Sequence, residues 1–231
     1  MSDIKFVPWV DTVRKVGQAY VLASTADILI VMAGRQSGKT LTGIAWLSDL
    51  AMSAPAWIPN NEPGIFWWVA PNYKVKDKPW ADLKAHIPKE LWQGKPNETE
   101  LRLTLKNGSI IWIKSADAPD SLVSAKLHGL VGDEAGQWKA AVWYQGLLPM
   151  FNTTQLKAMF LGTPRGRNWF YELWKRGRGP IGEALDEPNA VTETVGEQTV
   201  SISYHSFGWS SYESPYRNLA VLTEARRTTP R

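Results

Sequence analysis

The 231-residue chain contains no cysteine and only three histidines. These absences exclude disulfides, thiolate metal sites and a cysteine nucleophile, and three scattered histidines do not form the cluster that a zinc site needs. No apolar run approaches the roughly 18 residues of a membrane span. The first residues mix charged and apolar side chains instead of forming the apolar block of a signal peptide. We therefore expect an intracellular protein whose chemistry uses carboxylates, hydroxyls, lysine and arginine.

The remaining composition is that of a folded protein. It is 44% hydrophobic and 21% charged, and its length suits one large domain or one domain with an appendage. A net charge of +4 permits a polyanionic partner without requiring one. Tryptophan is unusually common, with 13 residues, and this indicates bulky core packing.

Strand-like and helix-like segments alternate through the first three quarters of the chain, which predicts an α/β fold. The short apolar runs predict buried parallel strands, and they lie at 28–33, 65–70, 127–132 and 158–162. A helical periodicity over 40–51 predicts a helix directly after the first of these runs. Asn107-Gly108 between two strand-like runs predicts an antiparallel hairpin added to a mostly parallel sheet.

The character of the sequence changes after Gly177, where Gly, Pro and an acidic, threonine-rich stretch interrupt the pattern. We therefore expect one core domain over residues 1–178 and a small lid or linker subdomain over 179–231. Within this second region, alternation predicts a strand at 199–204, and Ser214-Pro215 is a candidate start for a last helix.

Residues 33–40 fit the relaxed form of the phosphate-binding loop, in which Ala or Gly and four further residues precede Gly-Lys-Thr. The loop residues are Gly34, Arg35, Gln36, Ser37, Gly38, Lys39 and Thr40. Backbone N–H groups of such a loop wrap a polyphosphate while the following helix presents its positive end. Lys39 is then expected to reach the terminal phosphates and Thr40 to give a hydroxyl to Mg²⁺. The alternative, an incidental turn, is disfavoured because the segment lies between an apolar strand and an amphipathic helix.

Two further segments supply polar groups at the ends of apolar runs. Asp133 and Glu134 close one run, and downstream of a phosphate loop they suit an Mg²⁺-shell carboxylate and the base that activates water. The alternative is a pair of solvated acids. Thr163, in the segment Gly162 to Gly166, is placed to sense the γ-phosphate or the attacking water. Its alternative is a strand-ending turn.

These segments occur in a familiar order along the chain. Together with Gln18, Trp67 to Tyr73 and Ser115 to Leu122, they resemble the ATPase domain of the large terminase subunit of tailed bacteriophages, from about Val10 to the end. The resemblance implies a P-loop NTPase fold of the RecA/ASCE type. It also implies an Mg²⁺-dependent ATPase motor that packages double-stranded viral DNA into a procapsid.

By position, the resemblance assigns an adenine contact to Gln18 and a γ-phosphate contact to Arg35, and places Thr163 in the segment that couples hydrolysis to movement. It implies the portal protein and the small terminase subunit as partners. A homo-oligomeric ring is expected on the portal, and a monomer for the isolated domain. The implied location is the host bacterial cytoplasm, at the procapsid, with no membrane contact.

The sequence departs from the family in two places. Many relatives carry Leu-Arg-Gly with a candidate arginine finger where this chain reads Leu122-Val123-Ser124, so Lys126, Arg165 and Arg35 stay open as replacements. The family's metal-dependent nuclease domain is also absent, so no nuclease activity is expected, and the chain is either an excised ATPase fragment or a natural truncation.

Two other functions stay open on the sequence alone. One is a helicase-like or other RecA-type ATPase acting on DNA, although most helicases need a second lobe that this length does not hold. The other is a nucleotide-binding switch that does not hydrolyse ATP.

Overall fold

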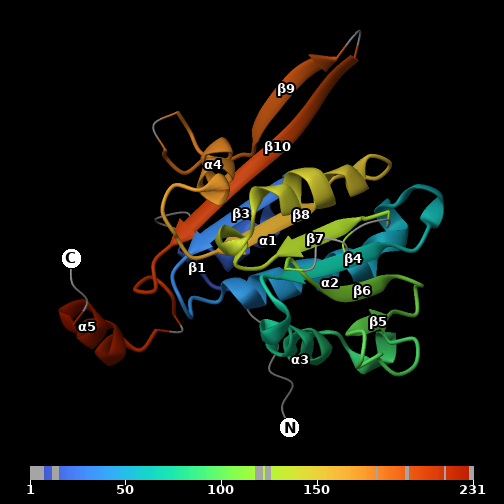
Figure 1. Ribbon diagram of the computed structural model, residues 1–231, viewed down its shortest axis with the longest axis horizontal. Helices are drawn as coiled ribbons and strands as arrows, with labels where there is room; N and C mark the ends of the chain where they lie inside the picture. Colours follow the sequence, from blue (N-terminus) through green and yellow to red (C-terminus); the bar gives the residue numbers. More distant parts are fainter. Residues whose placement is uncertain are drawn as a thin grey trace.

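The computed structural model describes residues 8–11, 16–117, 122, 126–180, 182–195, 198–215 and 217–228. Its central feature is an eight-stranded sheet in the order β5-β6-β4-β7-β8-β3-β10-β9 (Figure 1). Neighbouring strands from β6 to β10 are parallel, whereas β5 and β9 run antiparallel at the two edges. The strands of this sheet are β3 (Ile28–Ala33), β4 (Ile65–Ala70), β5 (Arg102–Thr104), β6 (Ile110–Ser115), β7 (Gly129–Gly132), β8 (Ala158–Gly162), β9 (Asn189–Val195) and β10 (Gln198–Trp209).

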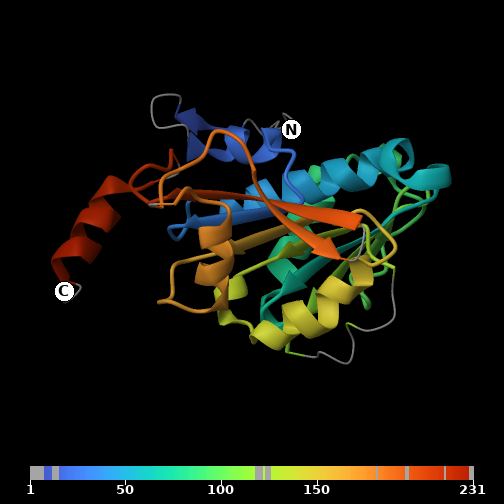
Figure 2. The same cartoon turned by 90° about the horizontal axis from the view of Figure 1, so that it is seen from above.

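Helices cover both faces of this sheet (Figure 2). They are α1 (Gln18–Ala23), α2 (Lys39–Trp57), α3 (Asp77–His86), a π-helix (Val142–Leu147), α4 (Trp169–Arg176) and α5 (Leu219–Thr228). Shorter elements are the paired strands β1 (Val10–Asp11) and β2 (Val16–Gly17) and 3₁₀ turns at Pro59–Asn61, Tyr73–Val75, Lys89–Leu91, Ala135–Gln137 and Leu148–Phe151. In the described part of the chain, no helix combines the length and apolarity needed to span a membrane.

The strand β3 shows why the sheet is buried on both faces. Its residues are apolar throughout, so successive side chains enter opposite cores. Leu29 and Val31 belong to a core cluster that also contains residues of α1, α2 and α3, whereas Ile28 and Ile30 belong to one that contains residues of the π-helix and α4. This layering confirms the predicted α/β class.

The helix α2 is longer at both ends than the helix predicted over residues 40–51. Pro59 explains the stop after Trp57, because the residue before a proline is driven out of the helical region, and Ile58 has extended backbone. Near its start, Gly43 lies so close to the sheet that a Cβ atom there would meet Leu161 Cδ1 at 2.7 Å. The first turns of α2 are therefore held tightly against β8.

The predicted hairpin is present as β5 and β6. Gly108 has φ of 83°, the left-handed conformation that glycine adopts without strain. The side-chain amide of Asn107 donates to the carbonyl oxygens of Ala51 and Met52, at 2.9 and 3.0 Å. The turn thus fixes the hairpin to α2 as well as joining its two strands.

The region after 178 differs from the expected lid or linker subdomain. Residues 204–209 of β10 pair in parallel with the whole of β3, so this strand belongs to the central sheet. Residues 198–204 pair with β9, and the hairpin projects beyond the body of the sheet (Figure 1). A boundary after 178 would therefore cut through the central sheet instead of separating two folding units.

The last helix begins later than the predicted Ser214-Pro215. Asn218 supplies the N-terminal cap, since its Oδ1 accepts from the N–H groups of Ala220 and Val221 at 3.1 and 3.3 Å. An asparagine cap offers those N–H groups an acceptor that the earlier Ser-Pro pair does not. The resulting helix, α5, points away from the sheet (Figures 1 and 2).

Candidate active site

Three neighbouring strands bring the predicted segments together. The phosphate loop follows β3, Asp133 and Glu134 follow β7, and Thr163 follows β8, which lies between the other two. All three strands are parallel, so their carboxyl ends meet at one edge of the sheet. Ligand sites in open α/β sheets form at this edge.

The phosphate loop turns sharply between β3 and α2. Gly38 has φ of 87° and Gln36 has φ of 52°, both in the left-handed region. The Ser37 hydroxyl donates to the carbonyl oxygen of Gly34 at 2.6 Å and closes the turn from inside. Because α2 begins at Lys39, its unpaired N–H groups and positive dipole end lie at the loop, and Thr40 is the second residue of the helix.

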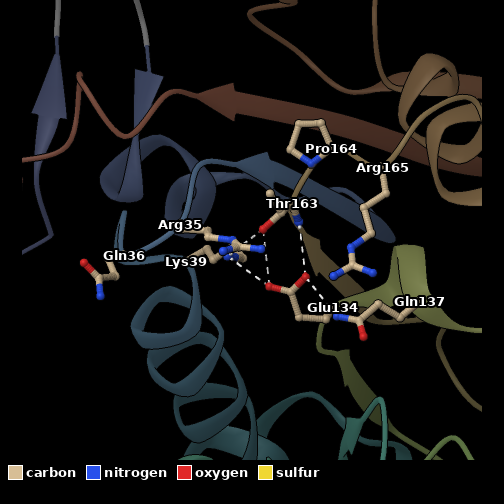
Figure 3. A pocket seen from close by; sticks show the side chains of 8 residues that line it. All are labelled: Arg35, Gln36, Lys39, Glu134, Gln137, Thr163, Pro164 and Arg165. Carbon is tan, nitrogen blue, oxygen red and sulfur yellow. Dashed lines mark hydrogen bonds and ion pairs between the residues drawn. The ribbon is translucent and has the colours of Figure 1, made fainter. Parts of the chain in front are cut away.

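Lys39, Glu134 and Thr163 converge from the three strand ends (Figure 3). The Lys39 Nζ lies 3.1 Å from Glu134 Oε1 and 3.3 Å from Thr163 Oγ1. The backbone N–H and hydroxyl of Thr163 also approach the Glu134 carboxylate, at 3.5 and 3.4 Å. Lys39 is only 6% exposed, so its charge is held where little water competes for it.

A cavity of about 660 Å³ opens beside this cluster. Figure 3 shows side chains from the loop and from the ends of β7 and β8 around it. Its lining residues are Arg35, Gln36, Lys39, Glu134, Gln137, Thr163, Pro164 and Arg165. Gln137 was not predicted as a site residue, although its position one turn after Glu134 is a signal that sequence reasoning could have used.

Glu134 combines an unusual backbone with a stabilised charge. Its φ of 46° and ψ of 43° are left-handed, which costs a non-glycine residue energy and occurs preferentially at functional sites. Burial by itself raises the pKa of the carboxyl. The charge and hydrogen bond of Lys39, with bonds from Thr163 N–H and Gln137, outweigh burial and hold the pKa below its ordinary value. Glu134 is therefore ionised at neutral pH, the state in which a carboxylate can accept a proton.

Asp133 lies deeper than its neighbour, at 9% exposed. Burial, and then the negative charge of Glu134, raise the pKa of its carboxyl to about 6 against the opposing effect of Lys39. A buried carboxylate with a raised pKa gains from a nearby cation.

The oxygen atoms available at the site suit magnesium better than a metal bound entirely by protein side chains. Across the described ranges, no three His, Asp or Glu residues gather as a metal site. Magnesium takes few protein ligands, all oxygens, and shares the rest of its shell with phosphates and water. The Thr40 hydroxyl and the Asp133 carboxylate are oxygen donors of this kind. Thr40 is the second residue of α2 and Asp133 directly follows β7, but neither is among the residues that line the cavity.

Gln18 lies behind the loop and does not line the cavity. Its side chain is fully buried, and its amide donates to the carbonyl oxygen of Gly38 at 2.9 Å. The Gln18 Oε1 accepts from the N–H of Trp9 at 3.3 Å. The adenine contact stays a prediction, whereas contact with the loop backbone is present.

The three residues left as candidates for the arginine finger differ in whether they line the cavity. Arg35 and Arg165 line the cavity, whereas Lys126 is not among its lining residues and pairs with Glu62 at 3.4 Å. Position 123, which the resemblance aligns with the arginine of the relatives, lies outside the described residues. Two arginines of this chain are thus placed at the cavity itself.

A sequence profile of the family described as terminase large subunit, T4likevirus-type, N-terminal, matches residues 30–180. The match covers the phosphate loop, both carboxylates and Thr163. The chain belongs to this terminase family.

Curated terminases support the same assignment. The large terminase subunit of Escherichia phage T5 is 28% identical over 159 residues, which are 64% of this chain and 36% of that protein. The large terminase subunit of Thermus virus P23-45 is 36% identical over 98 residues, 42% of this chain and 19% of that protein. The chain thus matches less than half the length of either terminase.

Solved terminases share the fold. The ATPase domain of the Thermus phage P74-26 large terminase superposes with a TM-score of 0.72 at 22% identity, covering 92% of this chain and 87% of that one. The large terminase of a thermophilic bacteriophage, in complex with ATP-gamma-S, gives a TM-score of 0.64 at 14% identity and covers 93% and 49%. These likenesses confirm the predicted fold, a mostly parallel sheet flanked by helices.

The burial of Asp133 predicts a stability effect in this terminase chain. The unfolded chain releases the Asp133 proton near its ordinary pKa of 3.8 and the folded chain near 6, so ionisation increasingly destabilises the fold as the pH rises through this window. We expect Asp133→Asn to raise the free energy of unfolding by up to about 3 kcal/mol at pH 7.5. The gain should fall to roughly half at pH 5. Urea unfolding at both pH values, without nucleotide or metal, measures it, and an equal gain at both would contradict this origin.

Proposed function

We propose that this chain hydrolyses ATP with Mg²⁺ and is the motor part of a terminase that moves double-stranded viral DNA into a procapsid. The observation that carries the proposal is the convergence of Lys39, Glu134 and Thr163 on one cavity beside the phosphate loop. Family membership supports it, as does the likeness to a terminase structure that holds ATP-gamma-S.

Each part of the site has a defined task in this reaction. The N-terminus of α2 and the loop N–H groups bind the phosphates, and the ammonium of Lys39 offsets their negative charge. Glu134 accepts the proton of the attacking water, for which its ionised state is required. Thr163 contacts both Lys39 and Glu134, so it connects the phosphate-binding side with the base. Thr40 and Asp133 would hold a magnesium ion, which would supply positive charge at the transferring phosphoryl group.

The finer assignments follow the family. The proposed partners are double-stranded DNA, the portal protein and the small terminase subunit, with the subunits in a homo-oligomeric ring on the portal. The proposed location is the host bacterial cytoplasm, at the procapsid.

Phosphate release by the purified chain tests the proposal. With ATP, Mg²⁺ and double-stranded DNA, we expect release well above that of the Glu134→Gln variant. Turnover should be slow for the isolated domain and rise with protein concentration if neighbouring subunits complete the site. Nucleotide binding with no phosphate above the variant would instead identify a switch that does not hydrolyse ATP.

The position of Arg165 at the cavity leads to a second prediction. Arg165→Ala should lower kcat by about tenfold, because the variant loses a cation from the space in which negative charge develops, while water partly screens an exposed arginine. Arg167→Ala is the matched control. Arg165 and Arg167 are both exposed and lie two residues apart, but only Arg165 lines the cavity. Steady-state kinetics on both variants measure the difference, and equal losses would show an effect of surface charge alone.

A further inference from the structure

The outer side of the phosphate loop is bound by residues from a distant part of the chain. The indole Nε1–H of Trp209 donates to the carbonyl oxygen of Ser37 at 3.1 Å, and the N–H of Gly34 donates to the carbonyl oxygen of Trp209 at 2.9 Å. The hydroxyl of Ser211 donates to the carbonyl oxygen of Arg35 at 2.9 Å. The end of β10 and the residues just after it thus bind three parts of the loop.

This contact is close, and its Trp209 half is buried, whereas the bond from Ser211 to Arg35 is exposed. A Cβ atom on Gly34 would lie 2.3 Å from the Ser211 Oγ and 2.4 Å from its backbone nitrogen, so only glycine fits there. Trp209 is 4% exposed, and its ring meets that of Trp9 edge to face at 5.5 Å between centroids. Trp9 in turn bonds Gln18, which bonds Gly38. A hydrogen bond in such surroundings is stronger than one in water.

The direction of these bonds determines where the loop's N–H groups point. In a trans peptide, the carbonyl of one residue and the N–H of the next point in opposite directions. The carbonyls of Arg35 and Ser37 are bound by Ser211 and Trp209, so the N–H groups of residues 36 and 38 point away from those two residues. Gln36 and Lys39, next to these peptides, line the cavity.

We infer that Trp209 and Ser211 are positioning residues for phosphate binding. By holding the Ser37 and Arg35 carbonyls, they orient the loop peptides before any phosphate arrives. The loop is then already ordered when ATP binds. Because little conformational entropy is lost at that step, the affinity for ATP is higher. The inference rests on the proposed function, because it assumes that the loop binds ATP.

Single substitutions separate this role from general packing. Trp209→Phe retains an aromatic ring against Trp9 and loses the donor to Ser37, while Ser211→Ala loses the donor to Arg35. Trp68→Phe is the matched control: its ring is fully buried, and its Nε1 has no hydrogen-bond partner among the described residues. All three proteins also need a thermal melt, so that a loss of stability is recognised.

The first measurement is ATP affinity in the presence of Mg²⁺, with steady-state kinetics. The loss of one hydrogen bond should weaken ATP binding about 3- to 10-fold in Trp209→Phe and Ser211→Ala. We expect KM to rise with it while kcat stays within about twofold, because the lost bond acts on binding and not on the base. Trp68→Phe should bind ATP as the wild type does.

The second measurement needs no nucleotide. Trypsin cleaves after Arg35 only when the loop opens, so the initial rate at this bond reports how firmly the loop is held. It should rise by about the same factor in both loop variants and stay unchanged in the control.

Unchanged ATP affinity or unchanged cleavage in both loop variants would overturn the inference, as would an equal effect in Trp68→Phe. If the wild-type chain itself binds no ATP, the proposed function fails and this inference fails with it. A wild type that binds ATP, with variants that bind equally well, overturns the positioning role alone.

Discussion

Replacing Glu134 by glutamine is expected to lower ATP hydrolysis by about 10²-fold or more while ATP binding is retained. Glutamine keeps the size of the side chain and an oxygen that can accept from Thr163, but it cannot take the proton of the attacking water. The loss of the base should therefore appear in kcat. Single-turnover phosphate release, together with a separate binding titration, measures the two effects independently.

The control for this variant is Glu172→Gln, on α4. Glu172 is an exposed glutamate that pairs with Lys175 at 2.9 Å, away from the cavity. This substitution removes the same charge without touching the site, so its hydrolysis should equal that of the wild type. Near-normal hydrolysis in Glu134→Gln would show that another group is the base.

Replacing Lys39 by alanine is expected to act on binding instead. The variant loses a 6% exposed ammonium beside the N-terminus of α2. Charge-assisted hydrogen bonds to phosphate are the strong ones, so ATP affinity should fall by about 10²-fold. Calorimetric titration with a slowly hydrolysed ATP analogue and Mg²⁺ measures this loss.

The same substitution changes the environment of the base. Lys39 lowers the pKa of Glu134 and burial raises it, so the pKa should rise when Lys39 is removed. Lys175→Ala, which also loses an ion-paired lysine, is the control for general charge effects. If Lys39→Ala and Glu134→Gln lose ATP binding equally, the assignment of phosphate binding to Lys39 and of proton transfer to Glu134 is wrong.

Local sequence signals predicted the parts of this molecule whose causes are local. The apolar run of β3, the glycine-rich turn and the periodic α2 are consecutive in the chain, and their order alone indicates a phosphate loop. Asn107-Gly108 likewise determines its hairpin through its own backbone preferences. The carboxylates and Thr163 were found because each ends an apolar run.

Features that depend on distant contacts were not predicted. Nothing near residue 209 in the sequence shows that β10 pairs with β3, because the choice of neighbour depends on burial of both faces of the finished sheet. The same applies to Gln18, whose amide reaches the loop from 20 residues away. The left-handed backbone of Glu134 is imposed by its surroundings against the preference of its residue type.

The length of β10 gives the molecule a mechanical property. Its twelve residues form one continuous strand, about 40 Å long at the usual rise per residue. One half is anchored beside β3 and ends on the phosphate loop, and the other half stands out with β9 as an exposed arm. A force applied to this arm would therefore reach the phosphate loop along one continuous strand.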